Sequence, residues 1–154
     1  MFKRIQSFLN NVISSSKLDK IAESADDTRF SVAILLVEVM HADHVLHDEE
    51  QLLVIKLLQQ QFSLEESAAI ELFGRAKEKM KDAVSLHQYT SRINSELLYP
   101  QKFELMTNLW KVVFADGQVD RYEEHLVRRL ADLIHVSHKD FIKAKHLAAE
   151  STVC

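Results

Sequence analysis

The sequence contains very few residues that make turns or cross-links. Its 154 residues include two glycines, one proline and one cysteine, Cys154, which is the last residue. So little glycine and proline leaves little turn chemistry for a multi-stranded sheet. A single cysteine supplies neither a disulfide framework nor a thiolate metal site. No apolar run reaches the length of a bilayer-spanning helix, and FSVAILLVEVM has about half of it.

Several functional classes also lack their sequence signals. The net charge of −4 and the pI near 6.0 provide no general attraction to nucleic acid, which basic surfaces bind. The chain has no Gly-x-Ser-x-Gly motif, no internal cysteine and no glycine-rich phosphate loop. We therefore expect a protein that is not an enzyme, does not bind nucleic acid and acts with protein partners.

The residues that are present indicate helices. Hydrophobic residues make up 47% of the chain and charged residues 27%, which is typical of a folded domain. Asp26 to Thr28 is predicted to cap a helix that runs to about Ala42, and HDEE at 47–50 opens the next one. Pro100 suits the first turn of a helix, and Asp120 can cap another. Capping boxes are predicted at Ser63/Glu66, Ser85/Gln88 and Ser137/Asp140. The pattern predicts an all-α, compact bundle of about eight helices.

The amino-terminal segment is treated separately from the domain that follows. Residues 1–25 are predicted to form an amphipathic helix that packs on or next to a helical domain at 26–150, because the apolar residues between Phe2 and Ile13 fall on one helical face. The alternative is peripheral association of residues 1–20 with a membrane surface, as basic amphipathic helices do. Asn and Ser interrupt the apolar stretch, so it does not resemble an export signal, and we expect a cytoplasmic protein.

An internal repeat is visible when the chain is shifted by 73 residues. Residues 30–58 then align with 103–131 at nine identical positions, including the acidic pairs Asp43/Asp116 and Glu50/Glu123. Two helix–turn–helix copies bury their apolar faces most simply against each other, which predicts an internal duplication. The expected core residues are Phe30, Leu36, Val39, Leu53, Leu57, Phe103, Leu109, Trp110, Val112, Leu126 and Leu130.

The two acidic turns resemble a known family. ADHVLHDEE and ADGQVDRYEE, with LLYPQKFELMTNLWKVVFADG before the second, are similar to the TerB family of tellurite-resistance proteins and to the amino-terminal domain of the co-chaperone DjlA. The resemblance covers about residues 26–149, and His44 stands where the family has glycine. It implies a compact helical bundle of two related halves whose acidic residues are suspected metal ligands. The DjlA likeness implies an alternative, an adaptor that docks to a membrane or chaperone complex.

An ordinary EF-hand does not fit the second turn. If Gly117 is the sixth position of a calcium loop, the first and third ligand positions fall on Val112 and Phe114, which have no side-chain oxygen. The three histidines of HADHVLHDEE could bind zinc or another transition metal, but a turn is expected within that stretch, so they need not converge. We expect these histidines at the surface.

A composite site remains as the candidate. Asp43 and Glu50 from one turn, with Asp116, Asp120 and Glu123 from the other, would together hold a divalent cation, since hard cations prefer oxygen ligands. The alternative is that the same residues only cap helices by accepting backbone hydrogen bonds and favouring the helix dipole. With the family resemblance, the first interpretation predicts a non-enzymatic, cation-binding module in tellurite, metal or general stress response.

Overall fold

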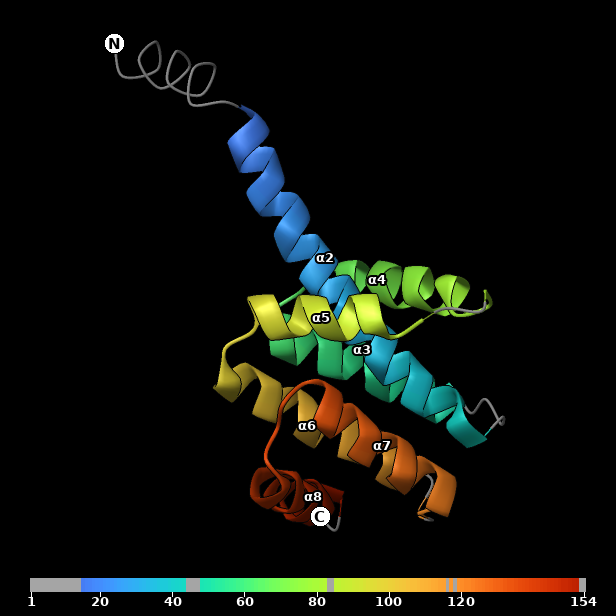
Figure 1. Ribbon diagram of the computed structural model, residues 1–154. Coiled ribbons are helices and arrows are strands. Elements are labelled where there is room, and N and C mark those ends of the chain that lie inside the picture. The colour runs from blue at the N-terminus through green and yellow to red at the C-terminus, as the bar shows by residue number, and fades with distance from the viewer. Residues whose placement is uncertain (1–14, 44–47, 83–84, 116, 118, 153–154) are drawn as a thin grey trace.

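The computed structural model describes residues 15–43, 48–82, 85–115, 117 and 119–152, and the side chains of 15–24, 43 and 152 are outside this description (Figure 1). The described residues form seven α-helices, one 3-10 helix and no strand. In chain order they are α2 (Ser15–Met40), η1 (His41–Asp43), α3 (Asp48–Phe62), α4 (Glu66–Lys79), α5 (His87–Glu96), α6 (Tyr99–Phe114), α7 (Arg121–Leu133) and α8 (His138–Thr152). The predicted all-α class and the compact bundle are confirmed.

Helix α2 is the centre of the bundle. Every residue from Val32 to Val37 is completely buried, and α2 packs against each helix from α3 to α7. A helix that is apolar on all sides must be enclosed on all sides, because any exposed face would leave apolar surface in water. In Figure 1 the first part of α2 projects from the bundle and its second part runs through it.

Helix α6 is the second element around which others gather. It packs against α2, α3, α7 and most extensively against α8. Trp110 on α6 is fully buried, with ring centroids 5.6 Å from Phe114 and 5.2 Å from Phe141 of α8. Aromatic rings contribute large buried areas, so this cluster fixes α8 against α6. Trp110 therefore has the core position predicted for it.

The predicted core residues are in the core. Those that are buried are Leu36, Val39, Leu57, Leu109, Trp110, Val112, Leu126 and Leu130, while Phe30, Leu53 and Phe103 are partly buried and pack against them. Asp48 and Arg121, the first residues of α3 and α7, are also aligned by the 73-residue shift. The internal duplication itself stays a prediction.

The predicted helix start at Asp26–Thr28 is wrong. The stretch Asp26–Thr28 lies inside α2, which continues through it without a cap. Its acidic side chains instead reach neighbouring helices: Asp26 pairs with Arg75 of α4 at 3.3 Å, and Asp27 pairs with Arg92 of α5 at 3.6 Å. Aspartate is common both in helix caps and in interhelical ion pairs, so residue type alone does not distinguish the two roles. Since α2 also crosses the predicted boundary between 25 and 26, the division of the chain into 1–25 and 26–150 stays a prediction.

Among the other predicted helix termini, some are confirmed and one is wrong. Pro100 lies in the first turn of α6, and Ser137 accepts a hydrogen bond from the Asp140 N–H at 3.2 Å, as predicted. Ser63 does not cap α4, which begins at Glu66 after Glu65. Ser63 has a φ of 53°, and the following N–H bonds back to Gln59 at 3.0 Å. This closure is typical of a helix end, so Ser63 terminates α3 instead.

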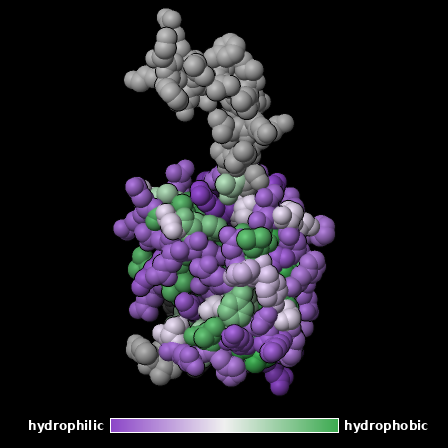
Figure 2. All heavy atoms as spheres, turned by 90° about the vertical axis from the view of Figure 1, so that its left-hand side faces the viewer, coloured by the Kyte–Doolittle hydropathy of each residue, from purple (hydrophilic) through white to green (hydrophobic). Residues whose placement is uncertain are grey.

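The surface agrees with the composition. Figure 2 shows a face that is mainly hydrophilic, with apolar side chains in separate patches. Among the helices that the structure describes, none combines the length and hydropathy needed to cross a bilayer.

Candidate functional site

The turn between α6 and α7 has a defined backbone geometry at its glycine. The Gly117 N–H donates to the Phe114 carbonyl at 3.0 Å, and Gly117 has a φ of 78°. Residues with a side chain are strained in this left-handed region, whereas glycine is not. No atom lies within 4 Å of the point where a Cβ would stand. The backbone conformation, and not a lack of space, therefore selects glycine at this position.

The two carboxylates that follow this turn have different surroundings. Asp120 is exposed and caps α7, since its side chain accepts a hydrogen bond from the Tyr122 N–H at 3.1 Å. Glu123 is the third residue of α7 and has only 4% of its surface exposed. The predicted capping role of Asp120 is confirmed. Capping alone does not require the burial of Glu123, because Asp120 serves as a cap from an exposed position.

The turn between α2 and α3 carries a matching buried glutamate. Helix α2 passes directly into η1, and α3 begins at Asp48. Asp48 and Glu49 are exposed, but Glu50, the third residue of α3, is only 4% exposed. Glu50 and Glu123 therefore share both their place in a helix and their degree of burial.

One element of the first acidic turn packs against the helix that follows the second turn. Helix η1, which ends at Asp43, packs on α7, the helix that carries Glu123. Asp116 and the side chain of Asp43 lie outside the described residues, so the proposed set with Glu50 and Asp120 is not tested as a whole. Within the described residues, no group of three or more His, Cys, Asp or Glu side chains is arranged to hold a metal ion.

Burial of a carboxylate is energetically unusual. Glutamate is almost never fully buried unless it is paired, because the ionised form loses its hydration. Neither Glu50 nor Glu123 is without a partner. Each also lies in the first turn of a helix, where the positive end of the helix dipole favours negative charge. The two glutamates thus share a position that favours the charged form through the helix dipole, and carboxylate oxygens are the ligands that Ca²⁺ and Mg²⁺ prefer.

Comparison with known proteins agrees with this architecture. The family model described as tellurite resistance protein TerB matches residues 29–146, which is most of the chain. The chain belongs to the TerB family. The TerB match begins in α2, ends in α8 and includes both acidic turns. No match was found among curated proteins or among solved structures.

This domain also has a polar cleft that was not predicted from the sequence. A space of about 450 Å³ lies between α2, the start of α5 and α7, and Glu38 and Arg129 face it. Burial raises the pKa of the Glu38 carboxyl above its usual 4.5, and the Arg129 guanidinium opposes this rise. One sequence feature could have indicated this cleft: Glu38 is the one charged residue in the apolar run FSVAILLVEVM.

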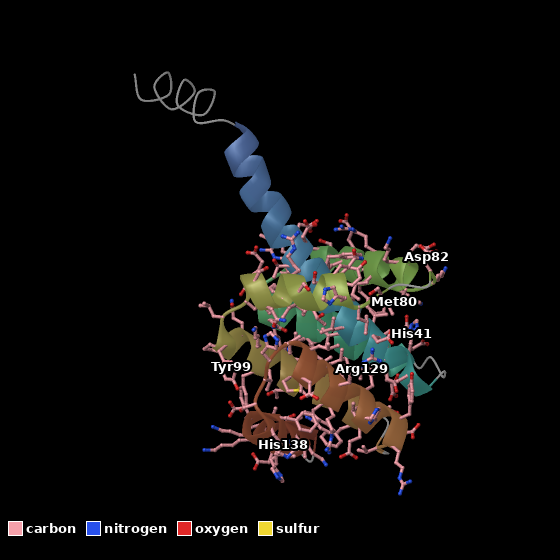
Figure 3. The ribbon with its side chains drawn as sticks, viewed as in Figure 1. His41, Met80, Asp82, Tyr99, Arg129 and His138 are labelled. Carbon is pink, nitrogen blue, oxygen red and sulfur yellow. The ribbon has the colours of Figure 1, made fainter. Side chains whose placement is uncertain are left out.

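A second missed cluster joins the starts of α6 and α8. The Tyr99 hydroxyl donates to the Asp140 carboxylate and lies 3.3 Å from the Ser137 hydroxyl. The hydrogen bond from Tyr99 is the main reason that the pKa of Asp140 lies below its usual 3.8. Figure 3 shows Tyr99 at the edge of the bundle, where α6 begins. Tyr99 and Asp140 lie 41 positions apart in the chain, so the sequence pattern did not connect them.

Proposed function

We propose that this TerB-family domain is a non-enzymatic module that binds a divalent cation at its two acidic turns and acts in the response to tellurite, metal or general stress. The observation that supports it is the matched burial of Glu50 and Glu123, each only 4% exposed at the third position of its helix. The packing of η1 on α7 supports a common site, because it holds the first turn against the helix that follows the second.

The burial favours cation binding over capping alone. The exposed Asp120 already supplies the side-chain cap of α7. Moving a glutamate out of water costs free energy that a solvated cap does not incur. A cation beside two carboxylates offsets this cost, because the Coulomb attraction is larger where water is excluded. Oxygen ligands indicate a hard ion such as Ca²⁺, Mg²⁺ or Mn²⁺.

The test is thermal unfolding with and without divalent cations. Because the cation binds only the folded state, a hundredfold excess over the dissociation constant should stabilise the protein by about 2.7 kcal/mol. Separate titrations with Ca²⁺, Mg²⁺, Mn²⁺ and Zn²⁺ identify the ion. Glu50→Gln and Glu123→Gln should reduce the cation-induced shift in melting temperature, and so should Asp116→Asn. Glu49→Gln is the matched control, since Glu49 precedes Glu50 in the same helical turn and is exposed.

Two outcomes would overturn the cation proposal. One is the absence of any melting shift in the unmodified protein at saturating concentrations of all four ions. The other is an equal loss of the shift in Glu49→Gln and Glu50→Gln, which would indicate general surface charge instead of a site. For the stress role, cells that depend on this protein for growth on tellurite should grow normally with Glu49→Gln and poorly with the double variant Glu50→Gln/Glu123→Gln.

The adaptor alternative has less support. The large apolar side chains that are well exposed include Leu52 on α3, Ile70 on α4, Leu98 before α6 and Leu147 on α8. They come from several elements, and the face in Figure 2 shows its apolar atoms in separate patches. Single exposed apolar residues are normal on soluble domains and do not by themselves indicate a docking groove. Membrane association was predicted for residues 1–20, and of these residues 1–14 and the side chains of 15–20 lie outside the described part of the chain.

A further inference from the structure

The cleft between α2, α5 and α7 brings groups of opposite charge to one space. It has a volume of about 450 Å³ and is lined by Glu38, Ser85, Leu86, His87, Arg129 and Leu133. Glu38 is half-buried, whereas Arg129, His87 and Ser85 are exposed. In Figure 3 Arg129 lies at the front of the bundle on α7. The carboxylate thus lies deeper than the guanidinium and the imidazole.

The two charged groups act on each other across the cleft without touching. The Arg129 guanidinium affects Glu38 through space, and within the described residues neither side chain has a hydrogen bond or a contact ion pair. A half-buried carboxylate without a hydrogen bond is costly, because water solvates it only in part. Glu38 therefore gains from any cationic group that enters the cleft, and Arg129 keeps its donors available for an anionic one.

We propose that this cleft binds a small zwitterion of the amino-acid class, with its ammonium group on Glu38 and its carboxylate on Arg129. A simple anion would meet the Glu38 carboxylate, and a simple amine would meet the Arg129 guanidinium. A ligand that carries both charges satisfies both groups. The His87 side chain also lines the cleft at the start of α5, where the positive end of the helix dipole favours a carboxylate.

Size and polarity narrow the ligand further. Small-molecule sites in proteins have volumes of about 300–1,000 Å³, and the cleft falls in this range. Its remaining lining, Leu86 and Leu133, consists of partly buried apolar side chains. An amino acid with an aliphatic side chain would cover this apolar surface while its charged groups contact the polar side.

The proposal does not depend on the acidic turns, because none of the residues predicted to bind the cation lines the cleft.

The experiment is a titration of the protein with leucine, in which NMR chemical shifts of the backbone amides and calorimetry report binding. Leucinamide, which has no carboxylate, and 4-methylpentanoate, which has no ammonium group, are the matched ligands. We expect leucine to shift amides around Glu38, His87 and Arg129 and to bind at least tenfold more tightly than either analogue.

Variants separate the cleft from general charge. Glu38→Gln and Arg129→Gln should each weaken leucine binding at least tenfold, and leucinamide should lose its residual binding only in Glu38→Gln. Two controls keep the affinity. Glu104→Gln removes a carboxylate of α6 whose pKa is also raised by burial, and Arg128→Gln removes the neighbouring cation of α7, which instead faces Glu124 and Phe141.

Clear results would overturn the proposal. One is that leucine at millimolar concentration leaves the amides of the cleft unshifted, and another is that leucine and its two analogues bind with equal affinity. Equal weakening by Arg128→Gln and Arg129→Gln would also refute it, because only Arg129 lines the cleft. Melting curves of each variant check that it is folded. Glu38→Gln should fold well, since burial already disfavours the charged form at this position.

Discussion

The turns before α3 and α7 share a buried glutamate but differ around it. Glu50 and Glu123 are each the third residue of a helix and each 4% exposed. The turn before α7 also has Gly117 at a φ of 78° and an exposed capping carboxylate, Asp120. The first turn has His44 at the position aligned with Gly117. The shared feature is therefore the glutamate, whereas Gly117 of the second turn has no glycine counterpart in the sequence of the first.

This difference separates two roles that acidic residues have at helix starts. An exposed aspartate caps the backbone, which is a local task that many sequences perform. A buried glutamate needs partners from the tertiary structure, because burial removes the water that would solvate it. The following predictions change one role at a time.

The largest effect is expected at the buried glutamates. Glu50→Ala and Glu123→Ala should each lower the free energy of unfolding by about 1–3 kcal/mol, because the groups that contact these buried carboxylates lose a polar partner. Gln at either position keeps the shape of the side chain and should cost less. Glu49→Ala should stay within about 0.5 kcal/mol, as is usual at the surface. Urea unfolding measures all three, and equal losses at Glu49 and Glu50 would remove the distinction between buried and exposed positions.

The two glycines should respond with opposite signs. Gly117→Ala should lower the free energy of unfolding by about 1–2 kcal/mol, because alanine is strained in the left-handed region. Gly74 lies inside α4, is exposed and has no atom within 4 Å of an added Cβ. Gly74→Ala should therefore stabilise the protein by about 0.5–1 kcal/mol. Urea unfolding of the two variants tests this, and a stabilising Gly117→Ala would contradict the turn geometry.

A smaller effect is expected for the cap itself. Asp120→Ala should cost about 1 kcal/mol, because the Tyr122 N–H loses its acceptor, while Asp120→Asn should cost little since asparagine also caps well. Thermal unfolding without divalent cations isolates the cap from any bound ion. If asparagine is as harmful as alanine under these conditions, the charge of Asp120 matters more than its hydrogen bond.

The smallest effect concerns α8, whose start has a side-chain cap. The lowered pKa of Asp140 means that its ionised form is favoured in the folded state. Its contribution to stability is present above about pH 3.8 and is lost as the pH falls through the lowered value. Tyr99→Phe removes the main cause of the shift, so the variant should lose less stability than the unmodified protein below that pH. Urea unfolding at a series of acidic pH values measures the difference, and parallel curves would contradict this role for Tyr99.

Local patterns predicted several local features correctly. The caps at Asp120 and Ser137, the position of Pro100 and the burial of Trp110 all follow from residue type and helical spacing. The same reasoning failed at Asp26–Thr28, which forms ion pairs with other helices, and at Ser63, which ends a helix. Composition does not distinguish these cases, because a polar residue can bond to its own backbone or to a distant helix.

The sequence by itself determined the all-α class, most of the core and the two acidic turns, because helical periodicity and the scarcity of glycine and proline act over short distances along the chain. Only the tertiary structure decided which carboxylates are buried. Glu49 and Glu50 are identical neighbours in sequence, yet one faces water and the other faces the bundle. Likewise, Glu38 faces Arg129 across a cleft because α2 and α7 pack together, and no local pattern relates residues so far apart in the chain.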